Sequence, residues 1–261
     1  MPAAAAAGLA YGWFEAGWVR LRVLELELEG LPRELDGVRI AHLSDFHLGM
    51  PSRGERAVAR AVDWVAERRP DVVCITGDLV SRRRGSALLA ALLDRLPADP
   101  YAVLGNHDFA ISRDPFSQPV QIVELPRGRL LADESVEVEL RGVRVELGGV
   151  DPRSWIAKRR SGFGPADAPF RILLCHFPTV LEKVEEGRWH LILAGHLHAG
   201  QIVLPYGRGR LLLAHPSAKY PNGVFRRPGT TMHVSPGLGT TFVPFRYFAR
   251  PEATELVLRC G

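Results

Sequence analysis

Paired cysteines, long apolar runs and low-complexity segments are scarce or missing in this chain of 261 residues. Its three cysteines stand at wide spacing without a CxxC pair, which argues against a disulfide framework and favours a reducing compartment. With 46% hydrophobic and 24% charged residues, the composition excludes a disordered or collagen-like chain. A domain of this length buries enough surface to be stable without a structural metal, so we expect any metal to serve chemistry.

The N-terminal segment, residues 1–18, is apolar but lacks the features of a signal peptide. It contains no Lys or Arg, so the basic start of such a leader is missing. Glu15 interrupts the apolar stretch, which falls short of the roughly 20 residues of a spanning helix. A membrane anchor and an interfacial helix are the two alternatives for this segment. We expect residues 19–261 to form a single domain, because no repeat or linker divides them.

The first half of the domain alternates apolar runs of strand length with helical patterns. Residues 38–43 and 71–76 predict buried strands, and an apolar stripe at helical spacing predicts a helix over 55–68. A second helix at 86–96 and a strand at 101–104 complete a βαβαβ unit. Such a unit implies parallel strands with helical crossovers.

The rest of the domain is rich in strands. Alternating Leu and Glu at 24–29 predict a half-buried strand, and Arg141-Gly142 predicts the turn of a hairpin. Further strands are expected at 170–175, 191–194, 201–204, 210–214, 231–235 and 254–258. The expected fold is therefore α/β (α+β), with two packed mixed β-sheets and helices outside them in a four-layer αββα sandwich.

Five polar clusters follow directly after predicted strands. The candidate metal donors in them are Asp45, His47, Asp78, Asn106, His176, His196 and His198. Because the carboxyl ends of neighbouring strands meet in one crevice, these scattered side chains are expected to form one site at that end. Carboxylate, amide and imidazole donors suit Mn, Fe or Zn, and the set is too large for one ion. We expect two divalent metal ions with one carboxylate bridging them.

The same clusters, in the same order, resemble the signature of the calcineurin-like metallophosphoesterases. The matching motifs span residues 38–200 and are Asp45-x-His47, Gly77-Asp78, Asn106-His107-Asp108, His176 and His196-x-His198. The phrases His42-Leu43-Ser44-Asp45 and Gly237-Leu238-Gly239-Thr240 are similar to the bacterial YkuE- and YaeI-type phosphodiesterase branch.

The resemblance implies a role for each of these residues. One ion would be bound by Asp45, His47 and His198, the other by Asn106, His176 and His196, with Asp78 bridging them. His107 would face the substrate, where it stabilises phosphoryl oxygens or protonates the leaving group, and Asp108 would orient its imidazole. The expected reaction is hydrolysis of a phosphodiester by in-line attack of a hydroxide bound to the metal ions.

Three further functions stay open beside this one. The first is a pyrophosphatase of the UDP-2,3-diacylglucosamine type acting on a nucleotide-sugar lipid, the second a nuclease, and the third a metal-binding scaffold without turnover. Arg82, Arg83 and Arg84 follow Asp78 closely and are the candidate substrate residues, because arginine suits phosphate recognition.

The expected partner is a small phosphate ester or a lipid head group. A formal net charge of +4 suits an anionic substrate, but aromatic residues are not interleaved with the basic clusters, so no nucleic acid is expected. No obligate protein partner is inferred. The expected location is the cytoplasm, with peripheral contact to the inner face of the membrane as the alternative.

Overall fold

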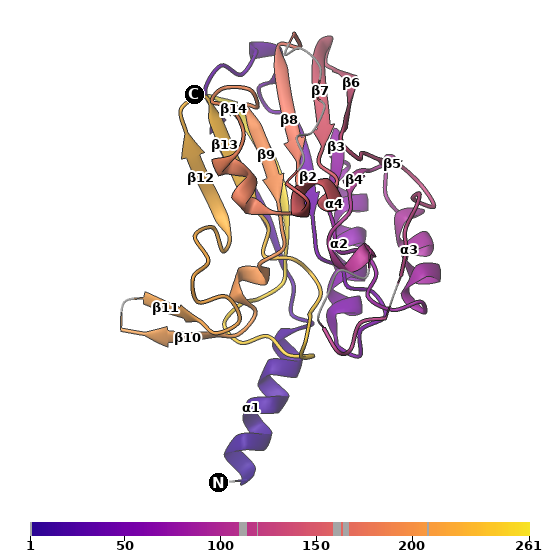
Figure 1. The fold of residues 1–261 in the computed structure, drawn as a ribbon, viewed down its shortest axis with the longest axis vertical. Helices are drawn as coiled ribbons and strands as arrows, with labels where there is room; N and C mark the ends of the chain where they lie inside the picture. Colours follow the sequence, from indigo (N-terminus) through magenta and orange to yellow (C-terminus); the bar gives the residue numbers. More distant parts are fainter. Residues whose placement is uncertain (1, 110–113, 119, 159–162, 164–166, 208) are drawn as a thin grey trace.

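The computed structural model describes residues 2–109, 114–118, 120–158, 163, 167–207 and 209–261 (Figure 1). Its first six-stranded sheet has the order β1-β14-β2-β3-β4-β5. The bounds of these strands are Arg20–Leu28 (β1), Glu252–Cys260 (β14), Arg39–Leu43 (β2), Val72–Thr76 (β3), Tyr101–Val103 (β4) and Arg129–Leu130 (β5). Strands β2 to β5 are parallel, whereas β14 runs antiparallel to β2 and parallel to β1.

The second six-stranded sheet has the order β12-β13-β9-β8-β7-β6. Its strands are Gly223–Arg227 (β12), Thr230–Val234 (β13), Leu191–Ala194 (β9), Phe170–Leu174 (β8), Val143–Gly149 (β7) and Glu134–Leu140 (β6). The four central strands are parallel, and the two outer strands are antiparallel to their neighbours. The predicted hairpin joins β6 to β7, with positive φ at Arg141 and Gly142.

Three layers of core hold the sheets and helices together. Apolar side chains of both sheets, such as Ile40 and Ile172, pack against one another between the sheets. Helices α2 (Gly54–Arg68) and α3 (Gly85–Leu93) cover the outer face of the first sheet. Short elements, α4 (Pro152–Ile156) and the 3₁₀ helix η3 (Pro178–Glu182), cover the outer face of the second. The predicted mixed α/β fold with two packed sheets is confirmed, and its fourth layer consists of these short elements.

Several element boundaries differ from the sequence-based expectation. Strand β1 begins at Arg20 rather than residue 24, and α3 ends at Leu93 rather than residue 96. The expected strands near 201–204 and 210–214 form a separate antiparallel hairpin, β10 (Val203–Tyr206) and β11 (Gly209–Leu212). Strands β5 and β12 and helix α4 were not expected, because they are short or carry polar side chains at the edge of a sheet.

The N-terminal segment forms a helix, α1 (Pro2–Glu15), which extends from one end of the molecule (Figure 1). Leu9, Trp13 and Phe14 on it are exposed. The helix is fastened at its C-terminal end, where the buried Glu15 carboxylate accepts the backbone N–H groups of Phe248 (3.0 Å) and Ala249 (2.7 Å). Among the described residues, no helix is long and apolar enough to cross a bilayer. Contact of α1 with a membrane surface stays a prediction.

Candidate metal centre

Five loops meet where the two sheets face each other, at the carboxyl ends of β2, β3, β4, β8 and β9. The first two run side by side, because Asp45 N–H donates to the Gly77 carbonyl (2.9 Å) and His47 N–H donates to the Asp78 carbonyl (2.9 Å). Backbone pairing of this kind satisfies polar groups that would otherwise be buried without a partner. The candidate ligands on these loops are therefore positioned by main-chain hydrogen bonds.

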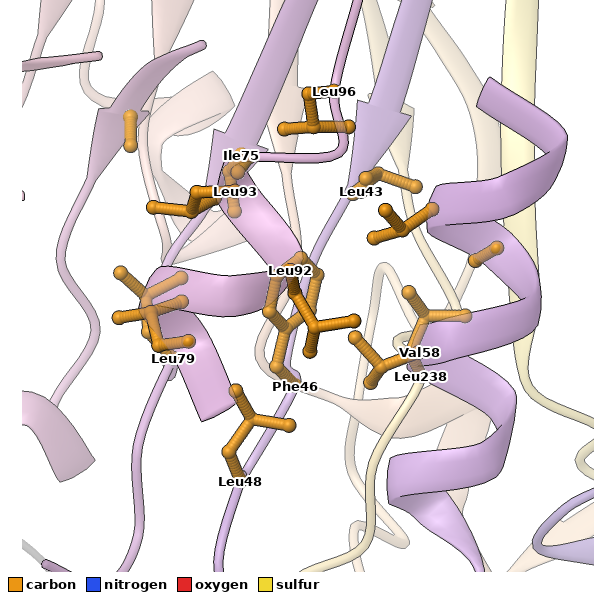
Figure 2. Close-up of a cluster of buried hydrophobic side chains, with 14 of the residues drawn as sticks. Leu43, Phe46, Leu48, Val58, Ile75, Leu79, Leu92, Leu93, Leu96 and Leu238 are labelled. Carbon is orange, nitrogen blue, oxygen red and sulfur yellow. The ribbon is translucent and has the colours of Figure 1, made fainter. Parts of the chain in front are cut away.

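Apolar residues interleaved with the candidate ligands anchor the same loops in the core. Phe46, Leu48 and Leu79 are fully buried among side chains of α2 and α3 (Figure 2). Phe46 lies between two candidate ligands in the sequence, and its side chain packs in the core beneath the helices. The apolar and polar residues of the motif thus have separate roles.

The structure brings six of the seven candidate ligands together in two groups that share one carboxylate. In each group, one potential ligand atom per residue lies within 4.8 Å of the others. The first group is Asp45, His47, Asp78 and His198, and the second is Asp78, His176 and His196. Asn106 lies beside the shared carboxylate, because the N–H of the next residue, His107, donates to Asp78 Oδ1 at 2.8 Å.

In the first group, nitrogen and oxygen atoms of facing side chains converge on one point. Nε2 of His47 lies 3.0 Å from Nε2 of His198 and 3.5 Å from Asp78 Oδ2. Nε2 of His198 lies 3.4 Å from Asp45 Oδ1. Behind the ligands, Ser44 Oγ donates to Asp45 Oδ2 (2.5 Å), and Ser81 Oγ lies 2.7 Å from His47 Nδ1. These outer contacts fix the ring and carboxylate orientations.

In the second group, His176 is oriented by the main chain. Its Nδ1–H donates to the Thr76 carbonyl (2.8 Å), which leaves Nε2 directed at Asp78 Oδ2 (3.3 Å). Nδ1 of His196 lies 3.1 Å from the same Nε2 atom. The His196 ring is partly exposed, whereas the other histidines of the two groups are buried.

The loops reach this arrangement at a conformational cost. Five of the candidate ligands have a left-handed backbone: Asp45 (φ 54°), His47 (φ 47°), Asp78 (φ 53°), His196 (φ 79°) and His198 (φ 49°). Such strain is uncommon for residues with a Cβ and concentrates at functional sites. Glycine is needed beside them, since a Cβ at Gly105 would overlap the Asp78 carboxylate and one at Gly195 would overlap Ser44 Oγ.

The electrostatics of the two groups differ. Burial raises the pKa of Asp45 to about 6 and lowers the pKa of His47 to about 3. Burial opposes protonation of His176 too, but the Asp78 carboxylate overcomes it and raises the pKa of His176 to about 9. Burial alone would raise the pKa of Asp78, yet the imidazole of His176 holds it well below the ordinary range.

The donor set fits divalent metal ions. Two buried carboxylates face imidazole nitrogens, and burial disfavours the charge on Asp45 unless a cation compensates it. Mixed oxygen and imidazole donors suit Mn, Fe or Zn. Ions bound here would be held by Asp45, His47 and His198 on one side, by His176 and His196 on the other, and by Asp78 between them.

The role expected for Asp108 needs correction. Its Oδ1 accepts the N–H groups of Leu79 (2.8 Å) and Val80 (3.1 Å), and its Oδ2 accepts that of Gly105 (2.9 Å). Asp108 therefore ties the loop after β3 to the loop after β4. It follows His107 within the short 3₁₀ helix η2 (His107–Phe109), which turns the two side chains in different directions.

The His107 ring lies inside the centre and is supported by Ser117. Its Nδ1 is 3.0 Å from Ser117 Oγ, and its centroid is 4.7 Å from that of the His47 ring. The ring is buried. Its expected contact with substrate stays a prediction.

Two of the three candidate substrate arginines connect loops in the structure. Arg82 Nε donates to the Phe116 carbonyl (2.5 Å), and Arg84 Nε donates to the Gly49 carbonyl (2.7 Å), while Arg83 is exposed. Phe116 precedes Ser117, so Arg82 helps to hold the segment that carries the partner of His107. Contact of these arginines with substrate stays a prediction.

Arg246 is the most prominent residue that the sequence analysis missed. It is completely buried, donates to the carbonyls of Pro236 (3.0 Å), Gly239 (2.7 Å) and Ala249 (2.8 Å), and places Nη2 3.1 Å from Nδ1 of His198. Only one signal, a charged residue in the aromatic-rich segment 242–248, marked it in the sequence.

Comparison with known proteins gives a consistent result. The family model described as calcineurin-like phosphoesterase matches residues 38–200. The uncharacterized metallophosphoesterases YkoQ and YkuE of Bacillus subtilis (strain 168) are also similar. YkoQ is 28% identical over 237 residues (87% of this chain, 85% of the relative), and YkuE is 26% identical over 251 residues (88% and 82%).

Two other similar proteins are larger than this chain. The transmembrane protein with metallophosphoesterase domain of Danio rerio is 32% identical over 260 residues, and the match covers 90% of this chain but 56% of that protein. A solved structure, the NAD nucleotidase of Haemophilus influenzae, aligns with a TM-score of 0.45 at 15% identity, covering 77% of this chain and 45% of that one.

The matched region extends over more than half of the chain. All the side chains that form the two donor groups lie inside it. The chain therefore belongs to the calcineurin-like phosphoesterases, a family of metal-binding hydrolases.

Proposed function

We propose that the chain hydrolyses phosphodiesters at a dinuclear metal centre. The observation that carries this proposal is the sharing of Asp78 by two donor groups: its Oδ2 lies 3.5 Å from Nε2 of His47 in one group and 3.3 Å from Nε2 of His176 in the other. A shared carboxylate is what a pair of ions a few ångströms apart requires. When bound, such ions lower the pKa of a water molecule and neutralise the oxygens of a phosphoryl group.

The chain's own residues would orient the ligands and handle the leaving group. Ser81 and the Thr76 carbonyl hold the rings of His47 and His176 so that Nε2 of each faces Asp78. His107, held by Ser117 at Nδ1, is the candidate for donating a proton to the departing alkoxide through its other ring nitrogen, Nε2. Asp108 keeps the loops that carry Asp78 and His107 in register.

Charge balance favours a diester over a monoester. Within the described part of the chain, the arginine that lies against a candidate ligand is Arg246, and its guanidinium is buried behind His198 on backbone carbonyls. A phosphate monoester carries nearly two negative charges at neutral pH, whereas a diester carries one. The smaller charge requires less compensation from side chains around the ions.

The test is hydrolysis of bis(p-nitrophenyl) phosphate beside p-nitrophenyl phosphate. Metal-stripped protein is resupplied with Mn, Zn, Ni or Mg, and metal content is measured with each. We expect metal-dependent cleavage with a higher kcat/KM for the diester. In Asp78→Asn we expect kcat/KM to fall by about 1,000-fold, since the bridging carboxylate serves both ions.

The matched control is Asp151→Asn, an equal change at a carboxylate that caps α4 outside the centre. It should keep both the activity and the metal content of the unmodified protein, because asparagine also caps helices well. A higher kcat/KM for the monoester, or activity in Asp78→Asn equal to that of the control, would refute the proposal.

A further inference from the structure

A pocket of about 510 Å³ opens beside the partly exposed ring of His196. One wall is formed by η3 and the residue before it, with Phe177 and Thr179. The other wall is the segment between β11 and β12, with His215, Ala218 and Tyr220. The volume falls within the range of roughly 300–1,000 Å³ that is typical of small-molecule sites.

The pocket is continuous with the second donor group of the metal centre. The centroid of the Phe177 ring lies 4.8 Å from that of His196 and 5.1 Å from that of His176. The His215 ring lies 6.2 Å from His196 on the other side. A phosphoryl group held at this donor group would therefore have one of its ester substituents at the mouth of the pocket. A second cavity, of about 440 Å³, has no candidate ligand in its lining.

The walls of the pocket carry aromatic rings, and its Lys and Glu side chains pair with each other. Lys219 Nζ and Glu182 Oε1 pair across its rim at 2.7 Å, and Tyr220 OH donates to the same oxygen at 3.2 Å. The His215 ring is partly buried. Tyr220 itself is fixed by an edge contact with the Phe225 ring, with centroids 4.9 Å apart.

We propose that this pocket binds one alcohol portion of the substrate and selects an uncharged, flat, apolar group. The inference rests on the proposed function for the phosphoryl group at the neighbouring centre. Aromatic walls favour a flat group through stacking and edge contacts. The neutralised Lys219 and Glu182 pair gives an anionic group no free partner and makes its desolvation costly.

Three phosphonates test the pocket without turnover. Methylphosphonate, phenylphosphonate and 4-carboxyphenylphosphonate present the same phosphonate to the centre and differ in the group that would enter the pocket. Isothermal titration of the metal-loaded protein measures each dissociation constant. We expect phenylphosphonate to bind about tenfold more tightly than methylphosphonate, since the ring is removed from water. The carboxyphenyl compound should lose most of that gain.

Two variants fill the pocket from opposite walls. Ala218→Trp acts from the segment between β11 and β12, and Thr179→Trp acts from η3. Each should remove the preference for phenylphosphonate over methylphosphonate, while metal content and methylphosphonate binding stay unchanged. Ala91→Trp, an equal enlargement at an exposed alanine of α3, is the matched control and should keep the preference. Melting temperatures verify that each variant is folded.

The outcomes separate this inference from the proposed function. A phenyl preference that both filled variants retain would overturn the pocket, as would equal binding of phenyl- and methylphosphonate by the unmodified protein. A phenyl preference abolished by filling supports the pocket even if no diester is cleaved, in which case the proposed reaction is wrong. Diester cleavage without any phenyl preference would support the reaction and refute the pocket.

Discussion

The two donor groups share Asp78 but are built differently around it. In the first group, every side chain is buried, and both histidines have a side chain behind them, Ser81 at His47 and Arg246 at His198. In the second, the Thr76 carbonyl orients His176, and His196 is partly exposed toward a pocket. The difference suggests that the first group mainly holds an ion, whereas the second holds an ion and also meets the substrate.

Arg246→Met should produce the largest difference between the two groups. It leaves the buried carbonyls of Pro236, Gly239 and Ala249 without this donor. Because each unsatisfied buried carbonyl costs about 1–3 kcal/mol, the free energy of unfolding should fall by more than about 3 kcal/mol. Metal affinity of the first group should fall by about 10-fold to 100-fold, because Arg246 no longer holds the backbone of the ligand loop through the His198 carbonyl. Chemical denaturation and metal content after dialysis measure the two effects.

Arg250→Met is the control for that variant. Arg250 lies in the same segment, but its guanidinium is stacked 3.7 Å from the Trp18 ring centroid at the surface. Its loss should cost less than about 1 kcal/mol and leave metal content unchanged. Equal loss of metal from both groups in Arg246→Met would show that the residue supports the whole fold and not the first group.

Ser81→Ala should affect the first group alone, by a smaller amount. The change removes the partner of His47 Nδ1 without creating a large cavity, so metal affinity should fall by about tenfold.

Ser117→Ala removes the hydroxyl that contacts His107 Nδ1 in the same way. We expect it to lower kcat and leave metal content unchanged. Loss of metal in both variants would contradict the assignment of His107 to substrate.

The first donor group was easier to predict from sequence than the contacts that support it. Asp45, His47 and Asp78 follow continuous apolar strands, so their position at the carboxyl ends is fixed by the strands themselves. Ser81 and Arg246 meet their histidine partners only through packing of segments 34 and 48 residues apart in sequence. Such contacts depend on loop conformations that no local pattern specifies.

Sequence proximity was misleading for Asp108. An acid next to a histidine suggests a supporting pair, but the turn of η2 directs its carboxylate to the N–H groups of Leu79 and Val80. The edge strand β12 was missed for a related reason. Its solvent-exposed arginines hide the alternation by which a half-buried strand is recognised, and only its pairing with β13 defines it.

Proton release on metal binding should distinguish the second group from the first. The Asp78 carboxylate raises the pKa of His176 to about 9, so the ring is protonated at pH 7.5 and must lose that proton to bind a metal. Burial lowers the pKa of His47 to about 3, so this ring is already neutral. Loading with metal at pH 7.5 should therefore release about one proton, and none above about pH 10.

Titration calorimetry in buffers of different ionisation enthalpy measures that proton. Affinity of the second group should rise with pH up to about 9 and then level off, because deprotonated His176 is the species that binds. His176→Asn should abolish the release, whereas His47→Asn should retain it. A release that persists in His176→Asn would mean that another group carries the proton.

Glu182→Gln should give the smallest effect, confined to the open side of the second group. The variant frees Lys219 from its surface partner, so the rim of the pocket gains a positive charge. Binding of 4-carboxyphenylphosphonate should improve by about threefold relative to phenylphosphonate, and only at low salt, since an exposed charge is screened. Melting temperature and metal content should not change, because exposed ion pairs contribute little to stability. If the carboxyphenyl compound gains nothing at low salt, its carboxylate does not reach the rim formed by Lys219, which would contradict the placement of the ring in this pocket.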